Sequence, residues 1–163
     1  MRQNNYAVIG LPIYLLVALI ASTLVITIFT ISISSLFQET EITHIKTEIE
    51  KIITEAENMY EYSDSGTLKT IKISLPSSLK FVVFGGFPET EELLPKDNIL
   101  DEKTSNNYYF VTNDGAYNNY HSIARLCGKQ TDQIAIFKQG TYNIKLELVE
   151  GNDRRSYVKI YIW

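Results

Sequence analysis

Side chains that could perform acid–base or nucleophilic chemistry are few and scattered in this sequence of 163 residues. The only histidines are His44 and His121, and Ser122 follows the second of them. A Ser/His/Asp site needs a geometry that sequence spacing does not show. The motifs of serine hydrolases, phosphate-binding loops and zinc proteases do not occur. We therefore predict that the protein is not an enzyme and has no catalytic residue, cofactor or metal ion. An anchored enzyme would need a pocket that groups His121 with a carboxylate or a hydroxyl.

Cys127 is the only cysteine, so the chain forms no internal disulfide and no cysteine-rich metal site. Its position between Leu126 and Gly128 is typical of a small buried hydrophobic residue. An intermolecular disulfide or a lipidated thiol is the alternative interpretation.

Two polar segments could contact a ligand. Residues 86–107 include a long acidic loop whose carboxylates could coordinate Ca²⁺. Their spacing matches no EF-hand loop, and this favours a solvated surface loop. Asn and Tyr are dense between Asn106 and Tyr120, and both are common in adaptable binding surfaces. One interpretation is that this segment contacts a glycan or a partner. The other is that it is a loop whose tyrosine rings pack at the edge of the domain. The ligand of the 86–120 region, if it binds one, is unknown.

The elements that position these residues begin with a long apolar segment. No charged side chain lies between Gln3 and Gln38, and the apolar core of this part is residues 11–37. As a helix this core would rise about 40 Å, more than the bilayer's hydrocarbon thickness of about 30 Å. The apolar part of a secretory signal is about half as long. We therefore predict an uncleaved transmembrane helix over residues 11–37, preceded by a short cytoplasmic leader at residues 1–10.

The charges around this segment predict the orientation in the cell membrane. Arg2 precedes it, whereas Glu39 and Glu41 follow it directly. The positive-inside rule then places the N-terminus in the cytoplasm and the C-terminal part outside, on a single-pass protein. After Gln38 the chain has 14 basic and 19 acidic residues, a net charge of −5. Its Lys and Arg are scattered, which argues against nucleic acid or anionic lipid as a partner.

Residues 38–62 are predicted to continue the helix as an amphipathic extension, because no Gly or Pro occurs between Leu36 and Met59. Apolar side chains recur there at alternating intervals of three and four, a heptad stripe made of Ile42, Ile45, Ile49, Ile52, Ala56 and Met59. The stripe could pack on the protein's own C-terminal domain or form a parallel coiled coil with another copy. The helix should end near Tyr62, since a turn-forming cluster follows at 63–66.

Residues 63–163 are predicted to form an extracytoplasmic β-rich domain. Short segments of strand-forming residues alternate there with turn signals, at 67–75, 79–84, 108–112, 120–126, 133–138, 142–148 and 157–163. Six or seven such strands suggest an antiparallel sheet or a small β-sandwich. The heptad stripe is a candidate cover for one apolar face. The predicted fold class is therefore α+β, a long helix packed on an antiparallel sheet.

This layout resembles type IV pilins and pilin-like proteins, especially the archaeal ones. In that family a peptidase removes a short leader, typically after a Gly that precedes the apolar segment. The matching position here is Gly10 followed by Leu11. Ile9 stands where the family usually has Lys or Arg, and Leu15 replaces the Glu of bacterial pilins. Hydroxyl side chains that could bond between helices follow in the second half of the segment, at Thr23, Thr27, Thr30, Ser32, Ser34 and Ser35.

The resemblance implies a pilin-like structural subunit, such as a minor pilin, of an archaeal cell-surface filament. It would assemble through its N-terminal helix, with itself or with other pilin-like subunits as partners. The alternative is a membrane-anchored extracytoplasmic binding domain that does not polymerise.

Overall fold

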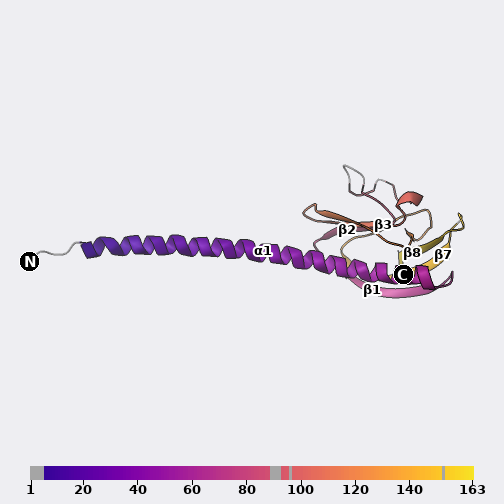
Figure 1. Cartoon of the computed structure of the whole chain (residues 1–163), viewed down its shortest axis with the longest axis horizontal. Helices are drawn as coiled ribbons and strands as arrows, with labels where there is room; N and C mark the ends of the chain where they lie inside the picture. The colour runs from indigo at the N-terminus through magenta and orange to yellow at the C-terminus, as the bar shows by residue number, and fades with distance from the viewer. Residues whose placement is uncertain (1–5, 89–92, 96, 152) are drawn as a thin grey trace, which may run out of the picture. The chain divides into compact units, whose positions relative to one another are not determined.

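A computed structural model describes residues 6–88, 93–95, 97–151 and 153–163. In this part the chain is α+β, as predicted: helix α1 (Tyr6–Tyr62), a 3-10 helix η1 (Glu102–Thr104) and eight strands in two sheets (Figure 1). The chain divides into two compact units, Met1–Thr40 and Glu41–Trp163, and the division falls within α1.

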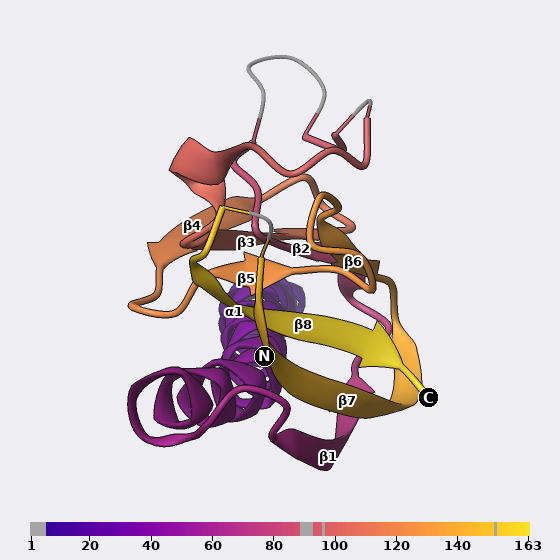
Figure 2. The same ribbon diagram turned by 90° about the vertical axis from the view of Figure 1, so that its right-hand side faces the viewer.

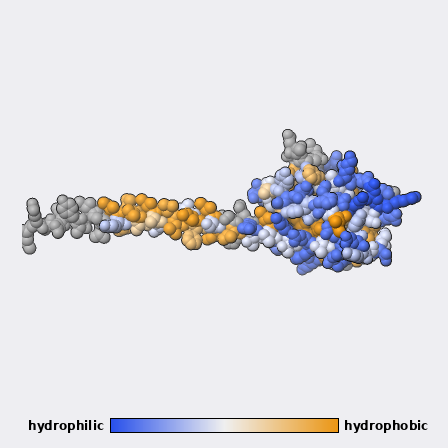
Figure 3. Space-filling model, viewed as in Figure 1, coloured by the Kyte–Doolittle hydropathy of each residue, from blue (hydrophilic) through white to orange (hydrophobic). Residues whose placement is uncertain are grey.

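In the first unit, Ile13–Ile33 is the one described segment long and apolar enough to cross a membrane. Its mean hydropathy is 2.5, and every side chain in it is exposed. Figure 3 shows this part of the helix as mostly orange, with scattered pale patches. Hydroxyl groups along it bond to the helix's own carbonyls: Ser22 Oγ donates to Ala18 O at 2.8 Å, and Thr27 Oγ1 to Thr23 O at 2.8 Å. Such internal bonding is what a helix needs in lipid, where no water is present to satisfy polar groups.

In the second unit, α1 ends at Tyr62, where the sequence predicts its end. The N–H of Ser63 donates to Met59 O at 3.1 Å and closes the last turn. Gly66 then adopts a φ of 91°, which favours a residue without a Cβ. Its N–H donates to Leu148 O at 2.7 Å, so the turn delivers the chain directly to a strand.

The first sheet has the strand order β1-β7-β8-β5. Its strands are β1 (Leu68–Leu75), β7 (Gly140–Glu150), β8 (Ser156–Ile162) and β5 (Leu126–Cys127). Strands β7 and β8 pair antiparallel, from Ile144 opposite Ile162 to Glu150 opposite Ser156. The exception to the antiparallel prediction is β5, which runs parallel to β8 with Leu126 opposite Val158.

The second sheet has the order β4-β3-β2-β6, and all its pairs are antiparallel. Its strands are β4 (Tyr117–His121), β3 (Asn107–Thr112), β2 (Leu79–Phe84) and β6 (Ala135–Phe137).

Residues 120–126, predicted as one strand, are instead the end of β4, a connecting turn and the start of β5. The side-chain amide of Asn106 explains the break. Its Nδ2 lies 3.2 Å from each of three carbonyl oxygens, those of Ser122, Ile123 and Ala124. Three successive carbonyls gathered around one amide group are incompatible with an extended strand, whose carbonyls alternate in direction.

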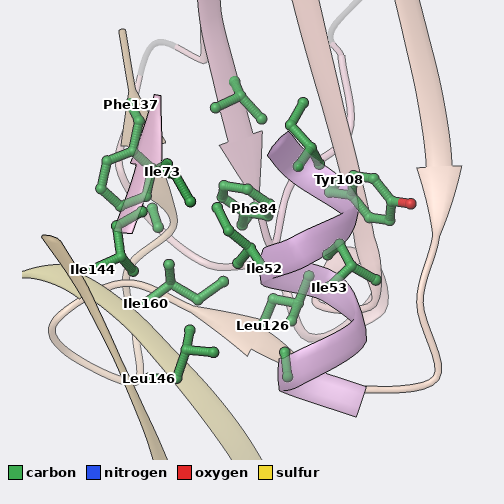
Figure 4. Close-up of a cluster of buried hydrophobic side chains, with 14 of the residues drawn as sticks. Ile52, Ile53, Ile73, Phe84, Tyr108, Leu126, Phe137, Ile144, Leu146 and Ile160 are labelled. Carbon is green, nitrogen blue, oxygen red and sulfur yellow. The ribbon is translucent and has the colours of Figure 1, made fainter. Parts of the chain in front are cut away.

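The main core contains side chains from α1 and from both sheets (Figure 4). Figure 2 shows the backbone of α1 beside the strands of the two sheets. Ile52 of α1, Phe84 of β2 and Leu126 of β5 are fully buried there. The other face of the second sheet carries a smaller apolar cluster formed by Phe81, Val83, Tyr109, Val111 and Ile134. Leu93 and Leu100 pack against this cluster, and Tyr109 Oη donates to Leu93 O at 2.6 Å. The segment interpreted as a solvated loop therefore covers part of a sheet with its described residues, while 89–92 and 96 lie outside them.

Candidate functional site

The heptad stripe of α1 lies in the core of the second unit. Ile45, Ile49, Ile52, Ala56 and Met59 are buried with residues of both sheets, and Ile42 packs against the same cluster partly exposed. Ile53 is buried as well. The strict heptad omitted it, but a helix with 3.6 residues per turn brings the residue beside Ile52 into the same apolar face. The chain's own domain thus surrounds these side chains.

Glu48 lies beside the stripe and is almost fully buried. Its Oε2 accepts a hydrogen bond from the backbone N–H of Ser74 on β1 at 2.8 Å, and its Oε1 pairs with Lys51. His44 Nε2 is 4.0 Å from the same Oε1. Burial opposes ionisation of Glu48, but the hydrogen bonds and the nearby cationic groups outweigh it, so its pKa lies below the ordinary value. Glu48 therefore connects α1 to the outer edge of β1 as a carboxylate.

Glu57 makes the corresponding contact with the segment that follows β4. Its Oε1 accepts from Ser122 Oγ at 2.8 Å and from the N–H of Ile123 at 3.2 Å. Ser122 Oγ in turn accepts from the N–H of Ala124 at 3.1 Å. Sequence spacing did not predict the contacts of Glu48 and Glu57, because their partners are 26 and 65 residues away along the chain. Only the pairing of Glu48 with Lys51 could be read from spacing.

In the part of the chain that the structure describes, His121 and Ser122 have different hydrogen-bond partners. Ser122 bonds to Glu57, whereas His121 is exposed and its Nδ1 lies 3.0 Å from Asn107 Oδ1. His44 is exposed on α1. Among the residues that the structure describes, no group of three His, Cys, Asp or Glu could hold a metal ion. That the protein is not an enzyme stays a prediction.

Cys127 is fully buried, and its Sγ lies 3.7 Å from Val158 O as a weak donor. Burial raises the pKa of its thiol to about 12. A thiol that stays protonated and inaccessible is neither a nucleophile nor a ready disulfide partner. Cys127 is therefore a small core residue.

The segment rich in Asn and Tyr has two faces. Tyr120 points inward, stacked on Tyr108 with ring centroids 5.3 Å apart and on Phe110 at 6.2 Å. Burial and the nearby carboxylates of Glu57 and Glu50 raise the pKa of Tyr108 to about 12, with a further contribution from Tyr120. Tyr117, Asn119 and His121 are exposed. Part of this segment thus belongs to the core, and part is available to a partner.

Gly10 and Leu11 lie in the backbone of α1, which begins at Tyr6. Residues 1–5 of the predicted leader are outside the described residues. Cleavage after Gly10 stays a prediction.

Comparisons with models of protein families, with curated proteins and with solved structures find no match to this chain. We therefore infer the function from which side chains of α1 are buried and which are exposed.

Proposed function

We propose that the protein is a pilin-like structural subunit, such as a minor pilin, of an archaeal cell-surface filament. Its N-terminal helix would lie in the cell membrane before assembly, with the N-terminus in the cytoplasm and the β domain outside. Packing of that helix against the helices of other subunits would then form the filament.

The proposal depends on one observation. Helix α1 has two apolar parts, and the rest of the chain buries only one of them. Residues 45–59 contribute to the core of the β domain, whereas Ile13–Ile33 is exposed along its whole length. Exposed apolar surface on that scale requires lipid, other helices or both. In a filament subunit, lipid would surround this segment before assembly, and neighbouring helices would surround it afterwards.

A membrane-anchored binding domain that does not polymerise is the second candidate. It is favoured by the exposed Tyr117 and Asn119 on β4, which could contact a surface ligand. In that case lipid alone would cover Ile13–Ile33 permanently. A signal sequence meets the same length and hydropathy criterion, and removal of the segment would then leave the β domain without an anchor.

Intact-mass measurement of the protein from native membranes and from sheared surface filaments tests the proposal. The expected mature chain begins at Leu11 and is present in the filament fraction. A Gly10→Leu variant should keep residues 1–10 and stay in the membrane, whereas an Ala7→Val control should mature normally.

Two results would contradict the proposal. One is retention of residues 1–10 on every native molecule. The other is a detergent-solubilised chain that stays monomeric and is absent from surface filaments, which would favour the anchored binding domain.

A further inference from the structure

The two sheets have four edge strands, and three of them are short or covered. Strand β5 has two residues and β6 has three. Strand β1 lies beside α1, where Glu48 accepts from the N–H of Ser74 and Glu55 pairs with Lys69. Short strands, charged side chains and covering helices are the means by which proteins prevent unwanted pairing at sheet edges.

Strand β4 has none of these protections. It has five residues, Tyr117-Asn118-Asn119-Tyr120-His121, with no proline and no Lys, Arg, Asp or Glu. Its pairing with β3 is continuous from Asn107 opposite His121 to Val111 opposite Tyr117, without a bulge. In the part of the chain that the structure describes, no strand pairs with its other edge.

The hydrogen bonds at the two ends of β4 determine which backbone groups face this open edge. Ser122 N–H donates to Asn106 O at 2.8 Å, and Thr112 N–H donates to Ala116 O at 2.9 Å. Bonded and non-bonded pairs alternate along an antiparallel ladder. Residues 118 and 120 therefore bond to β3, while the N–H and C=O groups of Tyr117, Asn119 and His121 point away from it.

We propose that this edge pairs antiparallel with the β4 edge of a second copy of the chain. Asn119 of one copy then lies opposite Asn119 of the other, and Tyr117 lies opposite His121. All three outward-facing residues of each copy pair in this one register, and two four-stranded sheets join into one. The contact is isologous, with the same strand contributed by both copies.

The side chains of β4 favour a second copy as the occupant. The strand has no Lys, Arg, Asp or Glu, and this register places the imidazole of His121 opposite Tyr117 rather than opposite a second His121. A phenol can accept a hydrogen bond from an imidazole, and its ring attracts the imidazolium form. The contact between the two β4 strands therefore places no two like charges opposite each other.

Cysteine cross-linking of the full chain in detergent tests both the contact and its register. Residues of a bonded antiparallel pair have Cα atoms about 5.5 Å apart, within the range of roughly 4.4–6.8 Å that a disulfide spans. Asn119→Cys should therefore form a disulfide-linked dimer at least about tenfold faster than Lys80→Cys, an exposed control on β2 of the same sheet. The unaltered chain is the blank, because Cys127 is buried.

The register gives a second control. Tyr117→Cys alone and His121→Cys alone should cross-link no faster than Lys80→Cys, but a mixture of the two should form the mixed dimer rapidly. Asn119→Pro should lower the dimer fraction in sedimentation without lowering the domain's melting temperature, because the N–H it removes faces away from β3.

Equal rates at positions 80, 117, 119 and 121 would overturn the proposal, since they would indicate random collision. Slow cross-linking at Asn119→Cys would overturn it as well. Neither result bears on filament assembly, which is read from maturation at Gly10 and from the filament fraction.

Discussion

Two stretches of α1 have the same secondary structure and opposite surroundings. Ile13–Ile33 has no charged residue and is apolar on all sides, and none of it is buried by the chain. Residues 45–59 have one apolar face, and the chain buries it completely. The polar side of that second stretch carries Glu48 and Glu57, which bond to backbone N–H groups of the domain.

The difference is the one expected between a helix that packs on protein and a helix that lies in lipid. A helix that packs on a sheet needs one apolar stripe and polar residues elsewhere. A helix in lipid needs an apolar surface all round and internal partners for its hydroxyls. Four predictions test whether the two stretches are distinct in this way.

The largest effect should follow from creating a cavity in the second stretch. Ile52→Ala removes a fully buried side chain and should lower the free energy of unfolding by about 4 kcal/mol. Ile26→Ala, the matched change in the first stretch, should leave domain stability unchanged. Denaturant unfolding of the full chain in detergent, followed by near-ultraviolet circular dichroism, measures both. Equal losses would mean that the two stretches share one core.

A charge in the first stretch should have the converse effect. Leu24→Arg should make membrane insertion less favourable by about 3 kcal/mol and should leave domain unfolding unaltered. Thr54→Arg, on the exposed side of the second stretch, is the control and should not affect insertion. The membrane-bound fraction after an alkaline wash reports the result, and full retention of Leu24→Arg would contradict a lipid-covered helix.

The sequence predicted best the elements that depend on local patterns. The end of α1 at Tyr62 follows from the turn-forming residues after it, and strands β7 and β8 follow from alternating apolar residues. The parallel pairing of β5 with β8 depends on contacts between Leu126 and Val158, 32 residues apart, which no local pattern specifies. The contacts of Glu48 and Glu57 with Ser74 and Ser122 were missed for the same reason.

A smaller effect should follow from removing the carboxylate at the edge of β1. Glu48→Ala leaves the N–H of Ser74 and the ammonium of Lys51 without this acceptor, and should destabilise the domain by about 2 kcal/mol. Glu50→Ala changes an exposed carboxylate on the same helix and should cost much less. Thermal unfolding of both variants checks the difference, and equal destabilisation would show that Glu48 has no special structural role.

The smallest effect is a dependence on pH. The pKa of Glu48 is lower in the folded chain than its ordinary value of 4.5. Folding therefore favours the ionised form, and the resulting stability is complete above pH 4.5 and is lost as the pH falls through the folded pKa. Glu48→Gln should remove this component, so its stability should fall less than that of the unaltered chain between about pH 6 and about pH 3. Parallel slopes in a pH series of unfolding curves would contradict the assignment.

We propose that lipid or other helices cover one stretch of α1, whereas the chain's own domain covers the other. Cysteine labelling in native membranes during a urea titration tests this difference most directly, with Leu24→Cys and Ile52→Cys each placed in a Cys127→Ala background. We predict that both thiols are unreactive at first, that position 52 becomes reactive as urea unfolds the domain, and that position 24 reacts only after detergent dissolves the membrane. Rapid labelling of position 24 in untreated membranes, or exposure of both positions at the same urea concentration, would contradict the account.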